Sequence, residues 1–289
     1  MRLAAALATF AAFCALALVV AYWGWQFFGP APVPVVVAPP ANPVAAIVDA
    51  HLFGASGSQH GPAAGATLPG DARLLGIIAT PNCATTPVVM ALWPVHRVNP
   101  VKRIVAATYQ SVSGTGGPAV TELRNMTREV LDEQPVKPEV YPHQIAFNLI
   151  PEIGSWKDDD YTSEEMKLVN ETRKIFHEPD IAISATCVRV PTFVSHAAAV
   201  FAELSEPMAP DKVRAVMASQ PGVVIQDDPR KSVYPQPWDA AGKDPVFVGR
   251  IREDISHPRG LDLWIVADNI RKGAALNAVQ IAEILARTL

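Results

Sequence analysis

The sequence places one cysteine where a thiol could act as a nucleophile. Cys83 follows a strand-like segment, residues 74–79, and precedes an apolar run that is expected to open a helix with Pro87 in its first turn. A thiol at a helix start faces unpaired backbone N–H groups and the positive end of the helix dipole, and both favour the thiolate. The alternative is a small buried hydrophobic residue, which is the interpretation favoured for Cys14 and Cys187.

A histidine and an arginine could assist such a nucleophile. His196 follows a strand-like apolar segment, residues 184–191, and a base must lie near the cysteine in space rather than in sequence. Arg189 alternates with apolar neighbours on that segment. Its side chain is therefore expected to point inward, where it needs an anion such as a carboxylate or a phosphate. The alternative for His196 is an ordinary surface or packed side chain, since the chain has seven histidines.

Two further patterns place polar groups at spacings that could form part of a binding site. Glu164 and Lys167 stand three residues apart and share a helix face, although a solvated i,i+3 ion pair would give the same pattern. Residues 111–117 form a loop of small residues after a strand, whose backbone N–H groups could approach an anion, but the pattern is a generic glycine loop. The three cysteines lie far apart, so the sequence predicts no disulfide framework, no CxxC pair and no metal site.

The elements that must position these groups are mainly strands. Strands are expected at 101–109, 181–193 and 200–204, an antiparallel hairpin at 246–252 and 261–266, and helices at 210–219 and 269–289. This order predicts the α+β class, with a mixed or antiparallel sheet and helices on one face. Hydrophobic residues make up 49% of the chain, enough for a sizeable core, and the net charge of −4 argues against a nucleic-acid surface.

A series of short motifs runs in order from residue 76 to the end. They are Pro-Asn-Cys at 81–83, Thr-Tyr-Gln-Ser-Val-Ser-Gly at 108–114, Ala-Phe-Asn-Leu-Ile-Pro at 146–151, Asn-Glu-Thr-Arg-Lys-Ile at 170–175, Ala-Thr-Cys-Val-Arg-Val-Pro at 185–191, Asp-Ala-Ala-Gly-Lys at 239–243, Ala-Asp-Asn at 267–269 and Arg-Lys-Gly-Ala-Ala at 271–275. The series resembles bacterial aspartate-semialdehyde dehydrogenases, from which it departs at Thr80 and Ala84.

The resemblance implies a role for each candidate residue. The implied roles are acyl-thioester formation at Cys83, acid–base catalysis by His196, substrate binding by Gln110, Arg189, Glu164 (amino group) and Lys167 (phosphate), and NADP binding by Ser113, Gly114 and Asn269. The implied reaction is the NADPH-dependent reduction of aspartyl phosphate to aspartate semialdehyde, in lysine, threonine and methionine biosynthesis, by a cytoplasmic homodimer. Thioester-forming oxidoreductases of the glyceraldehyde-phosphate or acyl-glutamyl-phosphate type are the alternative, which Gln110 and the motif at 170–175 disfavour.

The opening of the chain has a different texture. No charged residue occurs from residue 3 to residue 28, and Tyr22, Trp23 and Trp25 cluster at the far end, so residues 1–29 are predicted to be a single transmembrane anchor with a cytoplasmic N-terminus. A cleaved signal peptide is the alternative. Residues 30–73 form a Pro/Ala/Gly-rich linker with His-Leu-Phe-Gly at 51–54. This opening resembles the inner-membrane C component of type II secretion systems, which implies an inner-membrane location.

The two resemblances conflict with each other. No glycine-rich βαβ fingerprint of a dinucleotide-binding (Rossmann) domain precedes residue 76, so that domain is expected to be largely absent, with a fusion near residues 74–79 and the catalytic and dimerisation domain at 74–289. The apolar face of the last helix, with Ala278, Val279 and Ala282, should then be partly uncovered. An N-in anchor would also hold Cys83 outside the cytoplasm. Turnover is therefore expected to be impaired, and the alternative function is a membrane-anchored interaction protein with an inactive enzyme domain.

Overall fold

The computed structural model describes residues 79–288, and side chains up to residue 284. The chain divides into two units, residues 1–74 and 75–289, and the described residues belong to the second. Among these described residues, no helix is both long enough and apolar enough to span a membrane. The predicted anchor (1–29), the linker (30–73) and the strand-like segment up to residue 78 lie outside the described residues.

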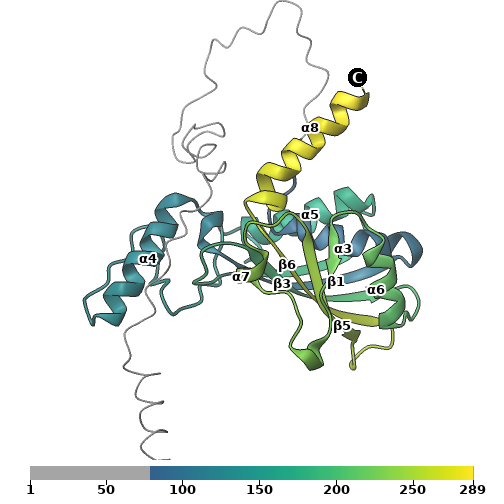
Figure 1. Ribbon diagram of the computed structural model, residues 1–289, viewed down its shortest axis with the longest axis horizontal. Coiled ribbons are helices and arrows are strands. Elements are labelled where there is room, and N and C mark those ends of the chain that lie inside the picture. The colour runs from purple at the N-terminus through teal and green to yellow at the C-terminus, as the bar shows by residue number, and fades with distance from the viewer. Residues whose placement is uncertain (1–78, 289) are drawn as a thin grey trace, which may run out of the picture. The chain divides into compact units, whose positions relative to one another are not determined.

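A six-stranded sheet forms the centre of the described unit (Figure 1). Its strands are β1 (Val101–Gln110), β2 (Ala182–Arg189), β3 (His196–Leu204), β4 (Val223–Ile225), β5 (Val246–Glu253) and β6 (Gly260–Ala267), in the spatial order β2-β1-β3-β6-β5-β4. β1 with β2 and β4 with β5 pair in parallel, whereas the three inner pairings are antiparallel. The predicted mixed sheet and the predicted β5–β6 hairpin are confirmed.

Helices and short turns connect these strands. They are α3 (Thr85–Val98), the 3₁₀ turn η1 (Val112–Gly114), α4 (Gly117–Leu131), α5 (Ser163–Phe176), α6 (Pro210–Ala218), the 3₁₀ turn η2 (Pro229–Lys231), α7 (Pro237–Ala240), the π-helical turn η3 (Arg271–Ala275) and α8 (Leu276–Thr288). In Figure 1, α4 lies to one side of the sheet and α8 projects away from it. The predicted helix at 269–289 is thus a bent π-turn followed by an α-helix.

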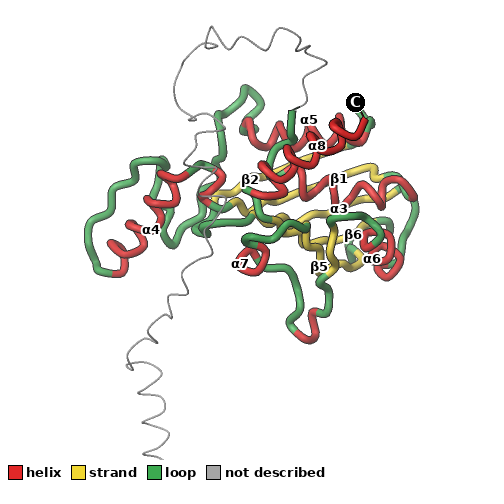
Figure 2. Tube along the Cα trace, turned by 45° about the horizontal axis from the view of Figure 1, so that its top comes forward, coloured by secondary structure: helices red, strands yellow, loops and turns green. Residues whose placement is uncertain are grey.

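The main core lies between the sheet and the helices of one face. Apolar side chains of α3, α5 and α6 pack on alternate residues of the strands, with Leu92, Ile104, Leu168, Met217 and Ile265 almost fully buried. The short helix α7 covers part of the opposite face, where Ala240 joins a smaller apolar cluster, and Figure 2 shows α7 and α5 on opposite sides of the strands. Most of the packed helices therefore lie on one face of the sheet, as predicted, but α7 lies on the other face.

Two boundaries differ from the sequence prediction in a way that affects function. β2 ends at Arg189 and β3 begins at His196, because residues 190–195 turn the chain and Ser195 adopts a left-handed φ of 74°. His196 is therefore the first residue of a central strand rather than a loop residue.

At the other end of the chain, Val279 on α8 is 53% exposed, in line with the expected uncovered apolar face.

Candidate active site

The strand register brings three predicted site residues together at one edge of the sheet. Gln110, the last residue of β1, lies opposite Arg189 at the end of β2 and opposite His196 at the start of β3. His196 in turn lies opposite Ala267, the last residue of β6, so Asn269 follows directly beyond the same edge. Residues far apart in sequence thus meet because β1 and β2 end at the same edge of the sheet where β3 begins.

The segment before α3 supplies the cysteine, but three backbone donors at the start of this helix are already used. Asn82 accepts hydrogen bonds through Oδ1 from the N–H groups of Ala84 (2.8 Å) and Thr85 (3.3 Å), and its carbonyl accepts from Thr86. Asn82 is therefore the side-chain cap of this helix, and it takes the donors that were expected to face the thiol of Cys83. The prediction that unpaired N–H groups face the thiol is therefore wrong for Ala84, Thr85 and Thr86, whereas the backbone N–H of Cys83 does lower the thiol pKa.

The thiol of Cys83 is held in its neutral form. Burial raises its pKa to about 11, the carboxylate of Glu164 adds to the rise, and the positive charge of Arg189 opposes it. A helix terminus contributes about 1 kcal/mol at most at ordinary sites, which is less than one pKa unit. Desolvation therefore outweighs the helix dipole, and the thiolate that the sequence predicted is not the form of this site without substrate.

We expect this raised pKa to be visible in the reactivity of the thiol. Because only about one molecule in 10⁴ carries a thiolate at pH 7 when the pKa is about 11, alkylation of Cys83 by iodoacetamide should rise about tenfold per pH unit up to roughly pH 10. Mass spectrometry of the Cys83 peptide measures this rate, and a Cys187→Ala chain serves as the control without the second described thiol. A plateau reached by pH 8 would contradict the burial argument.

Helix α5 carries Glu164 and Lys167 toward the same region. A capping box fixes its start, since Thr162 Oγ1 accepts from the Glu165 N–H (3.4 Å) and a Glu165 carboxylate oxygen accepts from the Thr162 N–H (2.7 Å). The other Glu165 oxygen accepts from the Cys187 N–H of β2 at 2.9 Å, which ties the helix to the sheet. Glu165 therefore sets the position from which its neighbours reach the site.

Glu164 and Lys167 form the expected i,i+3 pair, but they are not equally solvated. Their charged groups lie 3.5 Å apart, with 10% of the Glu164 side chain and 54% of the Lys167 side chain exposed. Glu164 also accepts a hydrogen bond from Asn82 Nδ2 at 2.9 Å, directly beside Cys83. The interpretation of a solvated surface pair is thus wrong for Glu164, which is buried. The side chain of Lys167 remains about half exposed to solvent.

Arg189 and His196 present buried donors. Arg189 donates from Nη1 to the Ser111 carbonyl at 2.7 Å, while its Nε has no partner among the described residues. His196 Nδ1 accepts from the Ser111 N–H at 3.1 Å, so the neutral ring carries its proton on Nε2, which has no partner in the described part of the chain either. Burial, with a smaller contribution from Arg189, lowers the His196 pKa to about 3. Unpaired buried donors are costly, so both are candidates for substrate contacts.

The loop at 111–117 is a tight turn rather than an anion-binding nest. The N–H groups of residues 112 to 116 donate to carbonyls of the loop itself or of residues 192 and 193. The expectation that these groups would face an anion is therefore wrong for residues 112–116. Gly114 has a different importance, since a Cβ atom there would lie 3.0 Å from Arg189 Nη1 and 3.1 Å from His196 Nε2. Its missing side chain leaves space directly beside both buried donors.

The start of α3 and the histidine border one small cavity. Ala84, next to Cys83, and Pro87 line it together with His196, and its volume of about 10 Å³ is close to that of one water probe. Gly273 of η3 packs on the cysteine, because a Cβ atom at this glycine would lie 3.0 Å from Cys83 Cβ. The site therefore joins α3, the sheet edge and η3 in one place.

Residues 92–272 match the model of a family described as semialdehyde dehydrogenase, dimerisation domain, which is more than half of the chain. The chain belongs to the semialdehyde dehydrogenase family. Among its relatives, an aspartate-semialdehyde dehydrogenase of Legionella pneumophila is 54% identical over 213 residues, 73% of this chain and 61% of that protein. The chain thus spans less than two thirds of this relative's length.

Solved structures agree with the family assignment. A crystal structure of aspartate semialdehyde dehydrogenase II from Vibrio cholerae complexed with ASA has a TM-score of 0.71 and 46% identity, and covers 73% of this chain and 62% of that one. The crystal structure of an aspartate semialdehyde dehydrogenase with NADP from Candida albicans has a TM-score of 0.52 and 25% identity, and covers 73% of this chain and 57% of that one.

The described residues of this semialdehyde dehydrogenase chain fit only the reactive end of a nicotinamide cofactor. Ser113 Oγ, the open space at Gly114 and the Asn269 amide lie at one edge, beside the Nε2–H of His196. The N–H groups of residues 112–116 are occupied, however, and the six described strands form a mixed sheet rather than a doubly wound parallel one. The described part therefore offers no cradle for the cofactor phosphates.

Two functional positions were missed although the sequence marked them. Asn82 belongs to the motif at 81–83 and Ser111 to the motif at 108–114, but no functional role was predicted for either residue. Asn82 caps α3 and holds Glu164, and Ser111 contacts both Arg189 and His196. Their importance follows from distant partners, 78 to 85 residues away along the chain, which no local pattern reveals.

Proposed function

We propose that the described domain carries the acyl-transfer site of an NADP-dependent aspartate-semialdehyde dehydrogenase. In the biosynthetic direction it would convert aspartyl phosphate to aspartate semialdehyde and phosphate. The observation that carries the proposal is the gathering of Gln110, Arg189 and His196 at one sheet edge, where the last two have unpaired buried donors and His196 borders a cavity with Ala84, the neighbour of Cys83. Family membership and the names of the relatives support the same reaction class.

Substrate binding uses the charges around the thiol. The planar guanidinium of Arg189 suits the α-carboxylate of the substrate, because it is buried and has donors to spare, and Gln110 is buried beside it. Glu164 would accept the ammonium group, and Lys167, with its solvent-facing amine, would meet the phosphate. These four groups would hold the carbonyl carbon near Cys83 and so lower the entropic cost of attack.

The covalent chemistry takes place on Cys83. The Cys83 thiol passes its proton to His196 as the sulfur attacks the acyl-phosphate carbon, a C–S bond forms, and the C–O bond to phosphate breaks as phosphate leaves. When bound, the nicotinamide would supply the hydride in this direction and would accept it in reverse. The protonated His196 then donates a proton to the oxyanion of the thiohemiacetal that forms after hydride transfer. It takes back the hydroxyl proton when the C–S bond breaks and the aldehyde leaves, and it returns that proton to the departing thiolate.

Substrate binding also alters the acid–base properties of the site. The Arg189 charge contributes to the lowered pKa of His196, so a carboxylate bound on that guanidinium would raise the histidine pKa. The histidine then becomes a stronger base when substrate is present. Such coupling explains how a site with a neutral thiol and a neutral imidazole can become reactive only after substrate enters.

The test is a Cys83-dependent assay of the whole chain and of residues 71–289. NADP reduction is followed with aspartate semialdehyde and phosphate, and nucleotide binding is measured separately by calorimetry. Turnover that requires Cys83 would support the proposal. Nucleotide binding without Cys83-dependent turnover, or neither of the two, would overturn it for this chain and would favour the membrane-anchored interaction protein. The anchor at 1–29 and the linker at 30–73 stay predictions.

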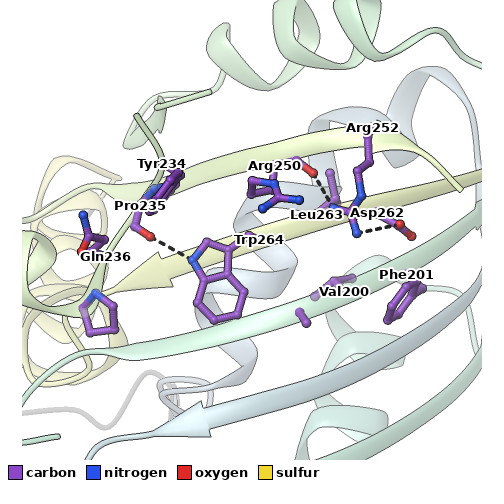
Figure 3. A pocket seen from close by; sticks show the side chains of 12 residues that line it. Val200, Phe201, Tyr234, Pro235, Gln236, Arg250, Arg252, Asp262, Leu263 and Trp264 are labelled. Carbon is purple, nitrogen blue, oxygen red and sulfur yellow. Dashed lines mark hydrogen bonds and ion pairs between the residues drawn. The ribbon is translucent and has the colours of Figure 1, made fainter. Parts of the chain in front are cut away.

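We further propose that the less covered face of the sheet binds a second copy of the chain. A cavity of about 380 Å³ opens there between β3, β5, β6 and the segment at 234–237 (Figure 3). Trp264 donates to the Pro235 carbonyl at 2.9 Å, Arg252 pairs with Asp262 at 2.8 Å, and Phe201 is 42% exposed. Aromatic side chains and arginines of this kind are enriched at protein interfaces, and the family description names dimerisation.

A charge on this face should therefore separate the subunits. Because an aromatic anchor at the centre of an interface commonly contributes 2 kcal/mol or more, Phe201→Glu is expected to raise the dimer dissociation constant by roughly 10²-fold. Sedimentation equilibrium measures this constant. Val98→Glu, which alters an exposed residue at the end of α3, is the control and should leave it unchanged. Equal dissociation constants for Phe201→Glu and the unaltered chain would exclude this face as the interface.

A further inference from the structure

Ser111 touches the histidine with two different groups. It is fully buried at the junction of β1 and η1, its N–H donates to His196 Nδ1 at 3.1 Å, and its Oγ lies 3.1 Å from the same nitrogen. The N–H can only donate, so it favours the ring form that carries its proton on Nε2. The hydroxyl can donate or accept, so it is compatible with either ring form. The N–H therefore opposes a proton on Nδ1, and the hydroxyl either adds to that opposition or offsets it, according to its own orientation.

The hydroxyl belongs to a longer chain of hydrogen bonds. Ser111 Oγ lies 3.0 Å from Ser113 Oγ, and both hydroxyls lie 3.2 Å from Asn269 Oδ1. Asn269 Nδ2 donates to Ser113 Oγ at 3.0 Å, and its Oδ1 also accepts from the N–H of Ser195, the strained residue before His196. The chain therefore ends on an amide that offers both a donor and an acceptor.

Both directions satisfy the two hydroxyls and the amide, but only the first gives the Ser111 N–H an acceptor, because in the second this N–H faces a protonated Nδ1. In the first direction the Asn269 amide N–H donates to Ser113, Ser113 donates to Ser111, and Ser111 donates to His196 Nδ1, which leaves the proton on Nε2. In the second direction Nδ1–H donates to Ser111 Oγ, and Ser111 donates to Asn269 Oδ1, which leaves the Nε2 lone pair free. Each hydroxyl gives one hydrogen bond and accepts one in either case.

We propose that the Ser111–Ser113–Asn269 chain of hydrogen bonds selects which imidazole nitrogen of His196 carries the proton. These three are positioning residues. The first direction makes neutral His196 a hydrogen-bond donor toward the site, and the second makes it a proton acceptor at Nε2. This inference rests on the proposed acid–base role of His196. It extends that role, because the two residues proposed to contact the nicotinamide, Ser113 and Asn269, also control the proton of the histidine.

The test reads the histidine directly and needs neither nucleotide nor substrate. Imidazole ¹⁵N chemical shifts of the full chain, labelled at histidine and assigned by comparison with His196→Gln, give the ratio of Nδ1–H to Nε2–H rings. Asn269→Asp replaces the amide donor with a carboxylate acceptor and fixes the second direction, so the ratio should rise about tenfold. Ser111→Ala keeps the backbone N–H but removes the hydroxyl, so the ratio should fall.

A double variant separates the chain from a simple charge effect. Ser111→Ala combined with Asn269→Asp should give the ratio of Ser111→Ala alone, within about twofold, because the link is cut while the charge remains. Asn99→Asp and Ser184→Ala, the same substitutions away from His196, are the controls. A rise of the same size in the double variant, or no response to either single variant, would overturn the inference.

This result can be distinguished from the outcome of the turnover assay. A ratio that responds as expected in a chain without Cys83-dependent turnover would support the hydrogen-bond chain and contradict the proposed function. Cys83-dependent turnover with an unresponsive ratio would contradict the hydrogen-bond chain alone. Thermal unfolding of each variant shows whether the fold is kept, and a merely loosened site would not move the ratio in opposite directions for the two single variants.

Discussion

Replacing Cys83 by serine is expected to lower NADP-dependent turnover of aspartate semialdehyde by on the order of 10⁴-fold or more, relative to the rate of the unaltered chain. A hydroxyl is a far weaker nucleophile than a thiolate, and an alkoxide leaves a tetrahedral intermediate less readily. The acyl adduct on the chain, followed by mass spectrometry with an acyl-phosphate substrate, should disappear together with the turnover.

Cys187 provides a matched control for this variant. It is also a free cysteine, it is fully buried in β2, and burial raises its pKa to about 12. Cys187→Ala should keep the rate within about threefold, since the substitution removes only a small buried group. Turnover that survives Cys83→Ser, or that is lost in Cys187→Ala alone, would show that the thiol of Cys83 is not the nucleophile.

The sequence was sufficient for the main fold because its strands are strongly patterned. Apolar runs at 101–109 and 246–252 became β1 and β5, and the alternation along them places one set of side chains under the helices. Helix α4 (Gly117–Leu131) was missed, although Ala119, Leu123 and Met126 recur at helical spacing. Its buried side chains form a separate small core.

The motifs predicted residues that the fold brings close together, but they did not predict the electrostatics around the thiol. The order of the strands in the sheet places Gln110 opposite both Arg189 and His196. The motifs that contain these residues were consistent with such a grouping. The state of the thiol depends instead on desolvation and on the cap formed by Asn82, and both arise from tertiary packing. A local rule about helix starts therefore predicted the wrong protonation state for Cys83, whose role as the nucleophile stays a prediction.

Arg189→Lys is the second change with a large expected effect. The substitution keeps the positive charge near Cys83 and His196 but removes the planar fork that suits a carboxylate. Two charge-assisted hydrogen bonds are each worth about 1.5–3 kcal/mol, so kcat/KM for aspartate semialdehyde should fall by roughly 10²- to 10³-fold, mainly through KM. Because the charge remains, the pH dependence of Cys83 alkylation should change little.

A substrate without the α-carboxylate makes this test specific. 3-Aminopropanal keeps the aldehyde and the amino group, so the unaltered chain should prefer aspartate semialdehyde over it by a large factor, and Arg189→Lys should lose most of that preference. Arg189→Met removes the charge as well. It should therefore raise the pKa of His196 and slow Cys83 alkylation, since the charge now lowers both pKa values. If Arg189→Lys lowered kcat/KM equally for both aldehydes, Arg189 would be organising the site rather than recognising the carboxylate. Its hydrogen bond to the Ser111 carbonyl would then be its main contribution.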